Sequence, residues 1–206
     1  DIGYLSINHY GEQLCGDHVE IAENDNSTII VLADGLGSGV KASILSTLTS
    51  KIISTMLAAG LDIRDAVETI ADTLPICSER KSAFSTFTII RLVNNDRADI
   101  IQYENPNVIL LRDGKNYEMQ LNTMRIGEKT IYHSGLNLRD GDTFIAMSDG
   151  VLYASSDGVL NESWDRDGLI SYVAPLWDAG FTAKTLTSII LDGIDRMQLR
   201  HGEIGA

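Results

Sequence analysis

The order of strand-like and helix-like segments predicts an α+β fold with a largely antiparallel sheet. Two strand patterns open the chain, two helix patterns follow, a longer series of strands comes next, and two helix patterns close it. Such grouping favours antiparallel pairing, because parallel strands need a crossover connection between them. No repeat, low-complexity tract or linker interrupts the 206 residues, so we expect a single domain over residues 1–206.

The first half of the chain predicts a hairpin followed by two helices. Asn24-Asp25-Asn26 is strong turn chemistry between two apolar, β-branched stretches. Apolar residues then recur at helical spacing, with Ser38 as the expected N-cap of the first helix and Pro75 as the end of the second. We expect strands at residues 17–23 and 27–33, and helices at residues 40–59 and 62–74.

The second half predicts a series of strands joined by polar turns. The turns are Asn94-Asn95-Asp96, Asp113-Gly114 and Arg139-Asp140-Gly141, and we also assign Asp142 to a turn. Helical spacing returns near the end of the chain. We expect strands at residues 85–93, 98–103, 108–111, 116–121, 130–136 and 143–147, and helices at residues 164–176 and 182–197.

Composition limits the partners and the compartment. The net charge is −13 and the pI is near 4.5, which argues against nucleic acid or an anionic membrane surface as the main partner. No apolar run approaches the ~18 residues that a transmembrane helix needs, and the first residues do not form a signal peptide. Cys15 and Cys77 form no metal-binding or redox motif. We therefore expect a cytoplasmic protein.

Two acidic glycine turns, each after an apolar strand, are the most informative feature. One is Asp34-Gly35, after residues 29–33, and the other is Asp149-Gly150, after residues 144–148. An apolar run that ends on Asp-Gly brings a carboxylate to the edge of a core. Two such carboxylates in one cleft would suit a hard divalent cation, because Mg²⁺ and Mn²⁺ prefer oxygen ligands.

The glycine-rich stretch around Asp34 has two other interpretations. A Gly-rich turn between a strand and a helix is typical of dinucleotide-binding loops. That loop needs a parallel βαβ unit, however, and here a second helix pattern follows the first. An Asp at the start of the turn would also repel a pyrophosphate. The remaining interpretation is a strand-to-helix turn without chemical function.

Several motifs together resemble the metal-dependent protein serine/threonine phosphatases. More narrowly, they are similar to the bacterial branch typified by the stage II sporulation E phosphatase, and they cover nearly the whole chain in the right order. The motifs are Gly16-Asp17, Ala33-Asp34-Gly35-Leu36-Gly37-Ser38-Gly39, Ser85-Thr86-Phe87-Thr88, Asn105-Pro106, Leu111-Arg112-Asp113-Gly114, Arg139-Asp140-Gly141-Asp142 and Ser148-Asp149-Gly150-Val151.

The resemblance implies a four-layer α-β-β-α sandwich of two mostly antiparallel sheets flanked by helix pairs. It also implies two Mn²⁺ or Mg²⁺ ions and hydrolysis by a metal-activated water. Asp34 would bridge both ions, the Gly35 carbonyl would bind one, and Asp149 would bind the other. Asp17 would act as a ligand or through a bound water. Asp34 and Asp149 are therefore the expected catalytic residues.

The chain departs from the family pattern at three places. Leu14 and Cys15 precede Gly16 where eukaryotic members carry an Arg that holds phosphate, so no phosphate-binding Arg is assigned. Leu36 occupies the position at which eukaryotic members carry a His, so no general acid is assigned, and His18 is interpreted as a structural residue. Ala206 occupies the position of the last metal-binding Asp. We therefore expect a domain without its native C-terminal strand and with a weakened metal site.

The leading hypothesis is a phosphatase acting on phosphoserine or phosphothreonine of a bacterial regulatory protein. The resemblance implies a phosphorylated anti-sigma-factor antagonist as the substrate, and it leaves a homodimer open. The first alternative is a non-catalytic binding module with a phosphatase fold, motivated by the missing terminal ligand. The second is a nucleotide-binding oxidoreductase, which would need the turn at Asp34 to bind a dinucleotide.

Overall fold

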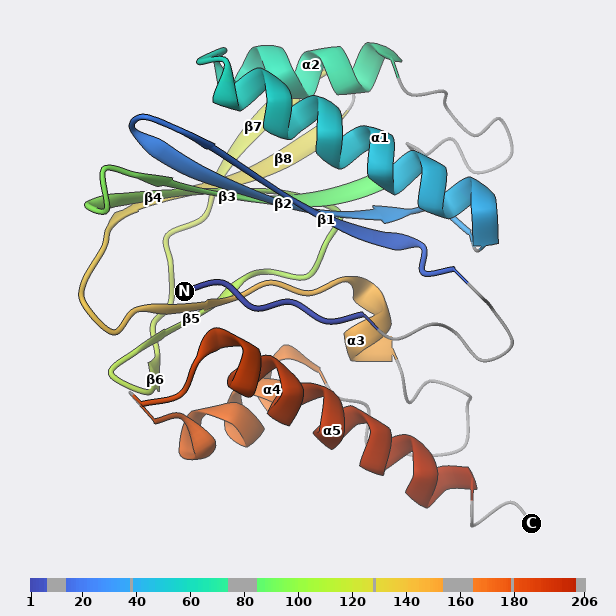
Figure 1. Cartoon of the computed structure of the whole chain (residues 1–206), viewed down its shortest axis with the longest axis vertical. Coiled ribbons are helices and arrows are strands. Elements are labelled where there is room, and N and C mark those ends of the chain that lie inside the picture. Colours follow the sequence, from blue (N-terminus) through green and yellow to red (C-terminus); the bar gives the residue numbers. More distant parts are fainter. Residues whose placement is uncertain are drawn as a thin grey trace. The chain divides into compact units, whose positions relative to one another are not determined.

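The computed structural model of the chain describes residues 1–6, 14–37, 39–73, 85–127, 129–153, 165–178 and 180–202 (Figure 1). They form two compact units, each made of segments that are separate in the sequence. We call residues 6–105 and 119–140 the large-sheet unit, and residues 1–5, 106–118 and 141–206 the small-sheet unit. Each contains one antiparallel sheet together with helices, which confirms the α+β prediction.

The large-sheet unit contains a six-stranded sheet in which every ladder is antiparallel. The strand that follows the two helices pairs antiparallel with the strand that precedes them. This pairing excludes the parallel βαβ unit that a dinucleotide loop requires. In spatial order the strands are β1 (Asp17–Asn24), β2 (Ser27–Gly35), β3 (Ser85–Val93), β4 (Arg97–Tyr103), β8 (Lys129–Asn137) and β7 (Asn122–Ile126).

The hairpin turns form where the sequence predicts them. The Asn24 carboxamide oxygen accepts hydrogen bonds from the backbone N–H groups of Asn26 (3.0 Å) and Ser27 (2.8 Å), which holds the β1–β2 turn. Between β3 and β4, Asn94 and Asn95 adopt left-handed φ values of 50° and 53°. Two consecutive left-handed residues are typical of the turns that match the twist of a hairpin.

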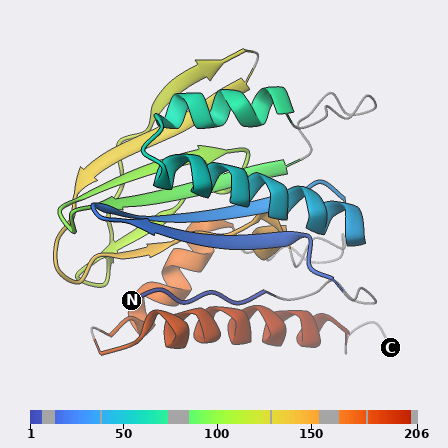
Figure 2. The same ribbon diagram turned by 45° about the horizontal axis from the view of Figure 1, so that its top comes forward.

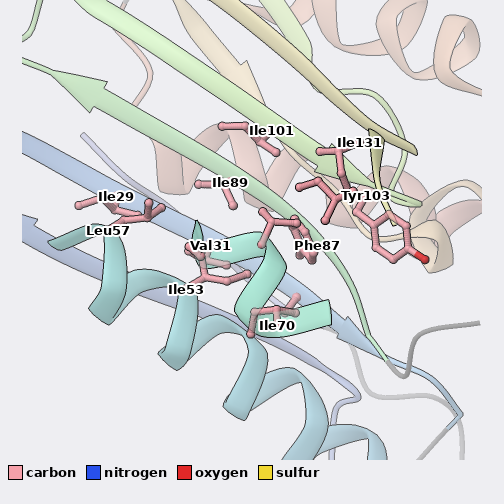
Figure 3. Close-up of a cluster of buried hydrophobic side chains, with 14 residues drawn as sticks. Ile29, Val31, Ile53, Leu57, Ile70, Phe87, Ile89, Ile101, Tyr103 and Ile131 are labelled. Atoms are coloured by element: carbon pink, nitrogen blue, oxygen red, sulfur yellow. The ribbon is translucent and has the colours of Figure 1, made fainter. Parts of the chain in front are cut away.

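Helices α1 (Gly39–Ala58) and α2 (Ile63–Thr73) cover one face of this sheet (Figures 1 and 2). Alternate residues of the central strands point toward them. Figure 3 shows this core, in which Ile53, Leu57 and Ile70 of the helices pack against apolar strand residues. The strand residues in the core include Ile29, Val31, Ala33, Phe87, Ile89, Ile101, Tyr103 and Ile131.

Helix α1 buries small polar residues beside its apolar core residues and leaves part of its apolar surface exposed. Its buried face contains Ser46, Thr49, Ser50 and Ser54. These hydroxyl groups donate to backbone carbonyls of the preceding turn, so each buried polar atom is satisfied within the helix. A stripe of apolar residues is exposed instead. It consists of Val40, Ile44 and Leu48, which are 61%, 53% and 47% exposed.

The small-sheet unit combines a short sheet with helices around a second core. Leu169, Val173, Leu186 and Ile190 of its helices pack with buried residues of the sheet. The first residues of the chain belong to this unit, where the Asp1 carboxylate accepts a 2.6 Å bond from the Ala183 N–H. Its elements are β5 (Ile109–Arg112), β6 (Lys115–Asn116), β9 (Thr143–Ile145), α3 (Asp149–Tyr153), α4 (Arg166–Val173), the 3₁₀ helix η1 (Ala174–Leu176) and α5 (Ala183–Gly202), with sheet order β6-β5-β9.

One of the expected strands is wrong. Of the strand expected at residues 116–121, only Asn116 lies in a strand, the two-residue β6, and the unexpected strand β7 begins directly after the range at Asn122. The missed signal is Gly127, whose φ of 58° lets the chain reverse between β7 and β8. Asp142 directly follows the predicted Arg139-Asp140-Gly141 turn, and its side chain, which is 1% exposed, forms an ion pair with Arg112 that the sequence did not reveal. None of the described helices is long and apolar enough to cross a membrane.

Candidate functional site

Asp17 and Asp34 lie directly opposite each other on neighbouring strands. The register of the β1–β2 ladder pairs them at its last position, and a backbone hydrogen bond joins the residues just beyond, Gly16 and Gly35. The Gly35 N–H donates to the Gly16 carbonyl at 3.2 Å. Because hydrogen-bonded and non-hydrogen-bonded pairs alternate, the two aspartates form a non-hydrogen-bonded pair, with Cα atoms about 4.5 Å apart. Two carboxylates therefore project side by side.

The two carboxylates project from the face of the sheet that the helices do not cover. Residues alternate along β2, and Val31 and Ala33 point into the core beneath α1. Asp34 and its partner Asp17 therefore point to the other face, and both residues are half-buried. His18 points toward α1, where its Nδ1 lies 2.9 Å from the Ser50 hydroxyl. This contact agrees with the structural role expected for His18.

Glycine is required at Gly35 because α1 packs tightly against the end of β2. A Cβ atom on Gly35 would lie 2.0 Å from the Ala42 carbonyl oxygen, which is impossible without moving the helix. Gly37 and Gly39 then adopt positive φ values of 93° and 69° to connect β2 to α1. The expected strand-to-helix turn is therefore present, whereas the expected cap Ser38 lies outside the described residues.

The neighbouring strand β3 continues the polar row at this end of the sheet. Thr86 is the ladder partner of Asp34, and the Ser85 hydroxyl donates to the Asp34 carbonyl oxygen at 2.9 Å. The Thr86 hydroxyl donates to the side-chain oxygen of Asn105, whose amide nitrogen donates to the Thr88 hydroxyl at 3.2 Å. Sequence reasoning noted these motifs as part of the resemblance but gave them no role.

Asp149 lies in the small-sheet unit, and its local structure differs from the expectation. Strand β9 ends at Ile145, and Asp149 is the first residue of α3 instead of a turn residue. It is exposed, and its negative charge is favourable in the first turn of a helix.

The oxygen donors of the large-sheet unit suit a hard divalent cation. Two carboxylates and the Gly35 carbonyl are the donor types that Mg²⁺ and Mn²⁺ prefer. Like charges directly opposite each other in a sheet are unfavourable, and a bound cation would remove that repulsion. Among the described residues, however, no group of three or more His, Cys, Asp or Glu side chains is placed to hold a metal ion.

Cys15 is next to this pair but is not arranged as a nucleophile. Its Sγ accepts a 3.4 Å hydrogen bond from the Asp17 N–H. Burial raises the pKa of the Cys15 thiol above its ordinary value, with a further increase from the nearby Asp17 carboxylate. The neutral thiol is therefore favoured, and a thiol is a weaker nucleophile than a thiolate.

A family profile identifies the chain. The profile of stage II sporulation protein E (SpoIIE) matches residues 24–202. The chain belongs to the SpoIIE family. This confirms the resemblance inferred from the sequence motifs. No curated protein sequence matches this SpoIIE-family chain significantly.

Solved structures share the fold of this SpoIIE-family chain. The PP2C phosphatase domain of SpoIIE from Bacillus subtilis, solved with a fragment of its regulatory domain, gives a TM-score of 0.68 at 20% identity, covering 92% of this chain and 56% of that one. The RsbU and RsbW domains of Rv1364c from Mycobacterium tuberculosis give 0.72 at 16%, covering 92% and 53%. RsbX in complex with magnesium gives 0.59 at 17%, covering 92% and 83%.

These similarities establish the fold as that of PP2C phosphatase domains. The SpoIIE-family chain spans little more than half the length of the first two solved structures. The pair Asp17–Asp34 lies in the large-sheet unit of this fold, and Asp149 lies in the small-sheet unit.

Proposed function

We propose that this domain is a metal-dependent protein phosphatase that hydrolyses phosphoserine or phosphothreonine. The observation that carries the proposal is the placement of Asp17 directly opposite Asp34 at the end of β1 and β2. Membership of the SpoIIE family and the PP2C fold support the reaction class. The two facing carboxylates place oxygen donors on one face of the sheet, and a cation beside them would offset their mutual repulsion.

In this proposal, Asp17, Asp34, the Gly35 carbonyl and Asp149 hold two Mn²⁺ or Mg²⁺ ions. The assignments of Asp149 and of the second ion rest on the resemblance to the family. Bound divalent ions would lower the pKa of water and neutralise phosphoryl oxygens. The role of the protein is to keep the acceptor oxygens fixed: the tight contact of Gly35 with α1 holds the end of β2. Leu36 offers no proton donor, so the proposal includes no general acid.

We further propose a phosphorylated anti-sigma-factor antagonist as the substrate and the cytoplasm as the location. The structures of RsbU and RsbW domains and of a bacterial stressosome protein support a regulatory protein as the substrate class. The net charge of −13 supports a protein substrate over nucleic acid.

The decisive experiment compares Asp34→Asn with Asp25→Asn. Both variants remove one negative charge from the same hairpin, but Asp25 lies in the exposed turn at the far end. Mn²⁺ binding by calorimetry and hydrolysis of p-nitrophenyl phosphate and of a phosphorylated antagonist should be lost only in Asp34→Asn. Metal-dependent hydrolysis that survives in Asp34→Asn would refute the assignment. Asp149→Asn tests the contribution of the small-sheet unit in the same assays.

The alternative is a binding module with a PP2C fold and no catalysis. It is favoured by the finding that no three metal-binding side chains cluster among the described residues. Calorimetry separates the two functions, because a module that has lost catalysis should show no Mn²⁺ binding that depends on Asp17 and Asp34. If the wild-type protein shows no Mn²⁺ binding through these residues and hydrolyses neither substrate, the binding module is the better description.

A further inference from the structure

We infer that Thr86 is a positioning residue of the cation site, with Asn105 setting the direction of its hydroxyl group. This inference rests on the proposed function, because it concerns the site formed by Asp17 and Asp34. Three observations carry it: the register of β3 against β2, the direction of the Thr86 hydrogen bond, and the burial of Asn105.

The register places Thr86 next to the carboxylate pair. Since Asp17 and Asp34 form a non-hydrogen-bonded pair, the Asp34 backbone groups point to the other side, toward β3. Asp34 and Thr86 are therefore a hydrogen-bonded pair, with Cα atoms about 5.5 Å apart and side chains on the same face. Asp17, Asp34 and Thr86 thus form one row across three strands, on the face away from α1.

Asn105 determines which groups the Thr86 hydroxyl can bind. A threonine hydroxyl has one proton, and that of Thr86 is donated to the Asn105 side-chain oxygen. Asn105 is itself held, because its amide nitrogen donates to the Thr88 hydroxyl at 3.2 Å and its side chain is buried. Toward Asp34, the Thr86 oxygen can therefore only accept hydrogen bonds or contact a cation.

Because the Thr86 hydroxyl can only accept hydrogen bonds on this side, it suits a hydrated cation and not a phosphate. A phosphoryl oxygen is also an acceptor, so it would gain nothing from a hydroxyl whose proton is already used. A hydrated cation beside Asp34 presents water protons, and an oxygen that only accepts can orient that water. Groups that orient metal ligands in this way typically change metal affinity by about 10–100-fold when they are mutated.

The test measures Mn²⁺ affinity of the full chain by calorimetric titration, without reference to catalysis. Thr86→Val should weaken Mn²⁺ binding by about tenfold, and Thr86→Ser, which keeps the hydroxyl group, should bind Mn²⁺ with nearly wild-type affinity. The matched control is Thr88→Val on the same face of β3. Thr88 also bonds to Asn105 but pairs with Leu32 instead of Asp34, so its loss should change Mn²⁺ affinity by less than about threefold. Asn105→Ala should weaken binding in the same direction as Thr86→Val, because the freed proton can then be donated to Asp34.

Asp34→Asn separates this inference from the proposed function. If Asp34→Asn abolishes Mn²⁺ binding while Thr86→Val leaves it unchanged, the inference is overturned and the proposed site stands. If Thr88→Val weakens binding as much as Thr86→Val, the effect is one of general stability and the inference is also overturned. If Asp34→Asn leaves Mn²⁺ affinity unchanged, the proposed site fails and the inference fails with it.

Discussion

The buried ion pair between Arg112 and Asp142 should be the most sensitive electrostatic contact of the small-sheet unit. Arg112 Nε and Nη2 donate to the two Asp142 carboxylate oxygens, each at 2.7 Å. The two side chains are only 10% and 1% exposed. The pair continues the β5–β9 ladder by one position beyond Leu111 and Thr143. Asp142→Asn keeps the size of the side chain but leaves the guanidinium buried without its counter-charge.

We expect Asp142→Asn to lower the free energy of unfolding by about 3 kcal/mol. Removing one partner of a buried pair costs about 3–5 kcal/mol, and the partial exposure of Arg112 favours the lower end. The guanidinium also stays protonated at pH 7 in the variant, because an arginine is effectively always charged in a protein. In the wild-type protein, the hydrogen bond to Asp142 raises the pKa of Arg112 above its ordinary value. A raised pKa means that the stabilisation is complete below the ordinary value, so it is fully present at pH 7.

Urea denaturation followed by tryptophan fluorescence measures this cost. Trp177 is a local reporter, because its indole N–H donates to the Thr143 hydroxyl at 3.1 Å, next to Asp142. A Trp164→Phe background removes the other tryptophan. With a slope of about 2 kcal/mol per M, a loss of about 3 kcal/mol lowers the urea midpoint by about 1.5 M.

The double variant Arg112→Met with Asp142→Leu provides the control. Replacing both members of a buried pair by apolar residues is often neutral or stabilising, so the double variant should regain part of the midpoint lost by Asp142→Asn. A midpoint shift for Asp142→Asn of less than about 0.3 M would mean that water reaches the guanidinium, and it would refute the reasoning from burial.

Three further predictions concern single side chains. Gly35→Ala should lower the stability of the large-sheet unit in thermal unfolding by more than about 2 kcal/mol, because the new methyl group would clash with α1. Gly127 has open space around it, so Gly127→Ala should lower the stability by about 1 kcal/mol, and equal losses for the two variants would contradict the clash. Asp165→Ala should lower the free energy of unfolding, measured by urea denaturation, by about 1 kcal/mol, because the Asp165 carboxylate caps α4 by accepting a 2.7 Å hydrogen bond from the Gly168 N–H. An unchanged free energy would contradict this capping role. Hydrogen bonds from Asn116 and Arg166 lower the pKa of Glu118, so Glu118→Gln should lower the free energy of unfolding by less than about 1 kcal/mol at this exposed site. In urea denaturation this loss should be present above pH 4.5 and should disappear as the pH falls further. A loss that does not depend on pH would contradict the prediction.

Local sequence signals were enough to predict the hairpins whose turn residues favour a turn by themselves. The Asn24 turn and the Asn94–Asn95 turn were predicted because asparagine side chains bond nearby N–H groups and tolerate left-handed φ values. The strand-to-helix turn also forms near its predicted place, but Asp34 and Gly35 still belong to β2, and the left-handed φ values come at Gly37 and Gly39. In α1 the helical period was correct, but it could not identify the buried face, since small polar residues face the core and Ile44 is 53% exposed.

Long-range pairing decided the features that the sequence did not reveal. The role of Asp142 depends on Arg112, thirty positions away, and an Asp before a strand has the same local pattern whether or not an arginine faces it. Asp149 was expected at the end of a strand because residues 144–148 are mostly apolar. The ladder of β9 ends at Ile145, because β5 offers partners for only three of its residues.

The opposition of Asp17 and Asp34 could have been predicted from the hairpin alone. A two-residue turn between Asn24 and Ser27 fixes the register of both strands. Asp17 precedes Asn24 by the same seven residues by which Asp34 follows Ser27, so the two must face each other. A slip of one residue would move one carboxylate to the opposite face and separate the pair. The metal hypothesis for the large-sheet unit therefore depends on the β1–β2 turn as much as on the aspartates themselves.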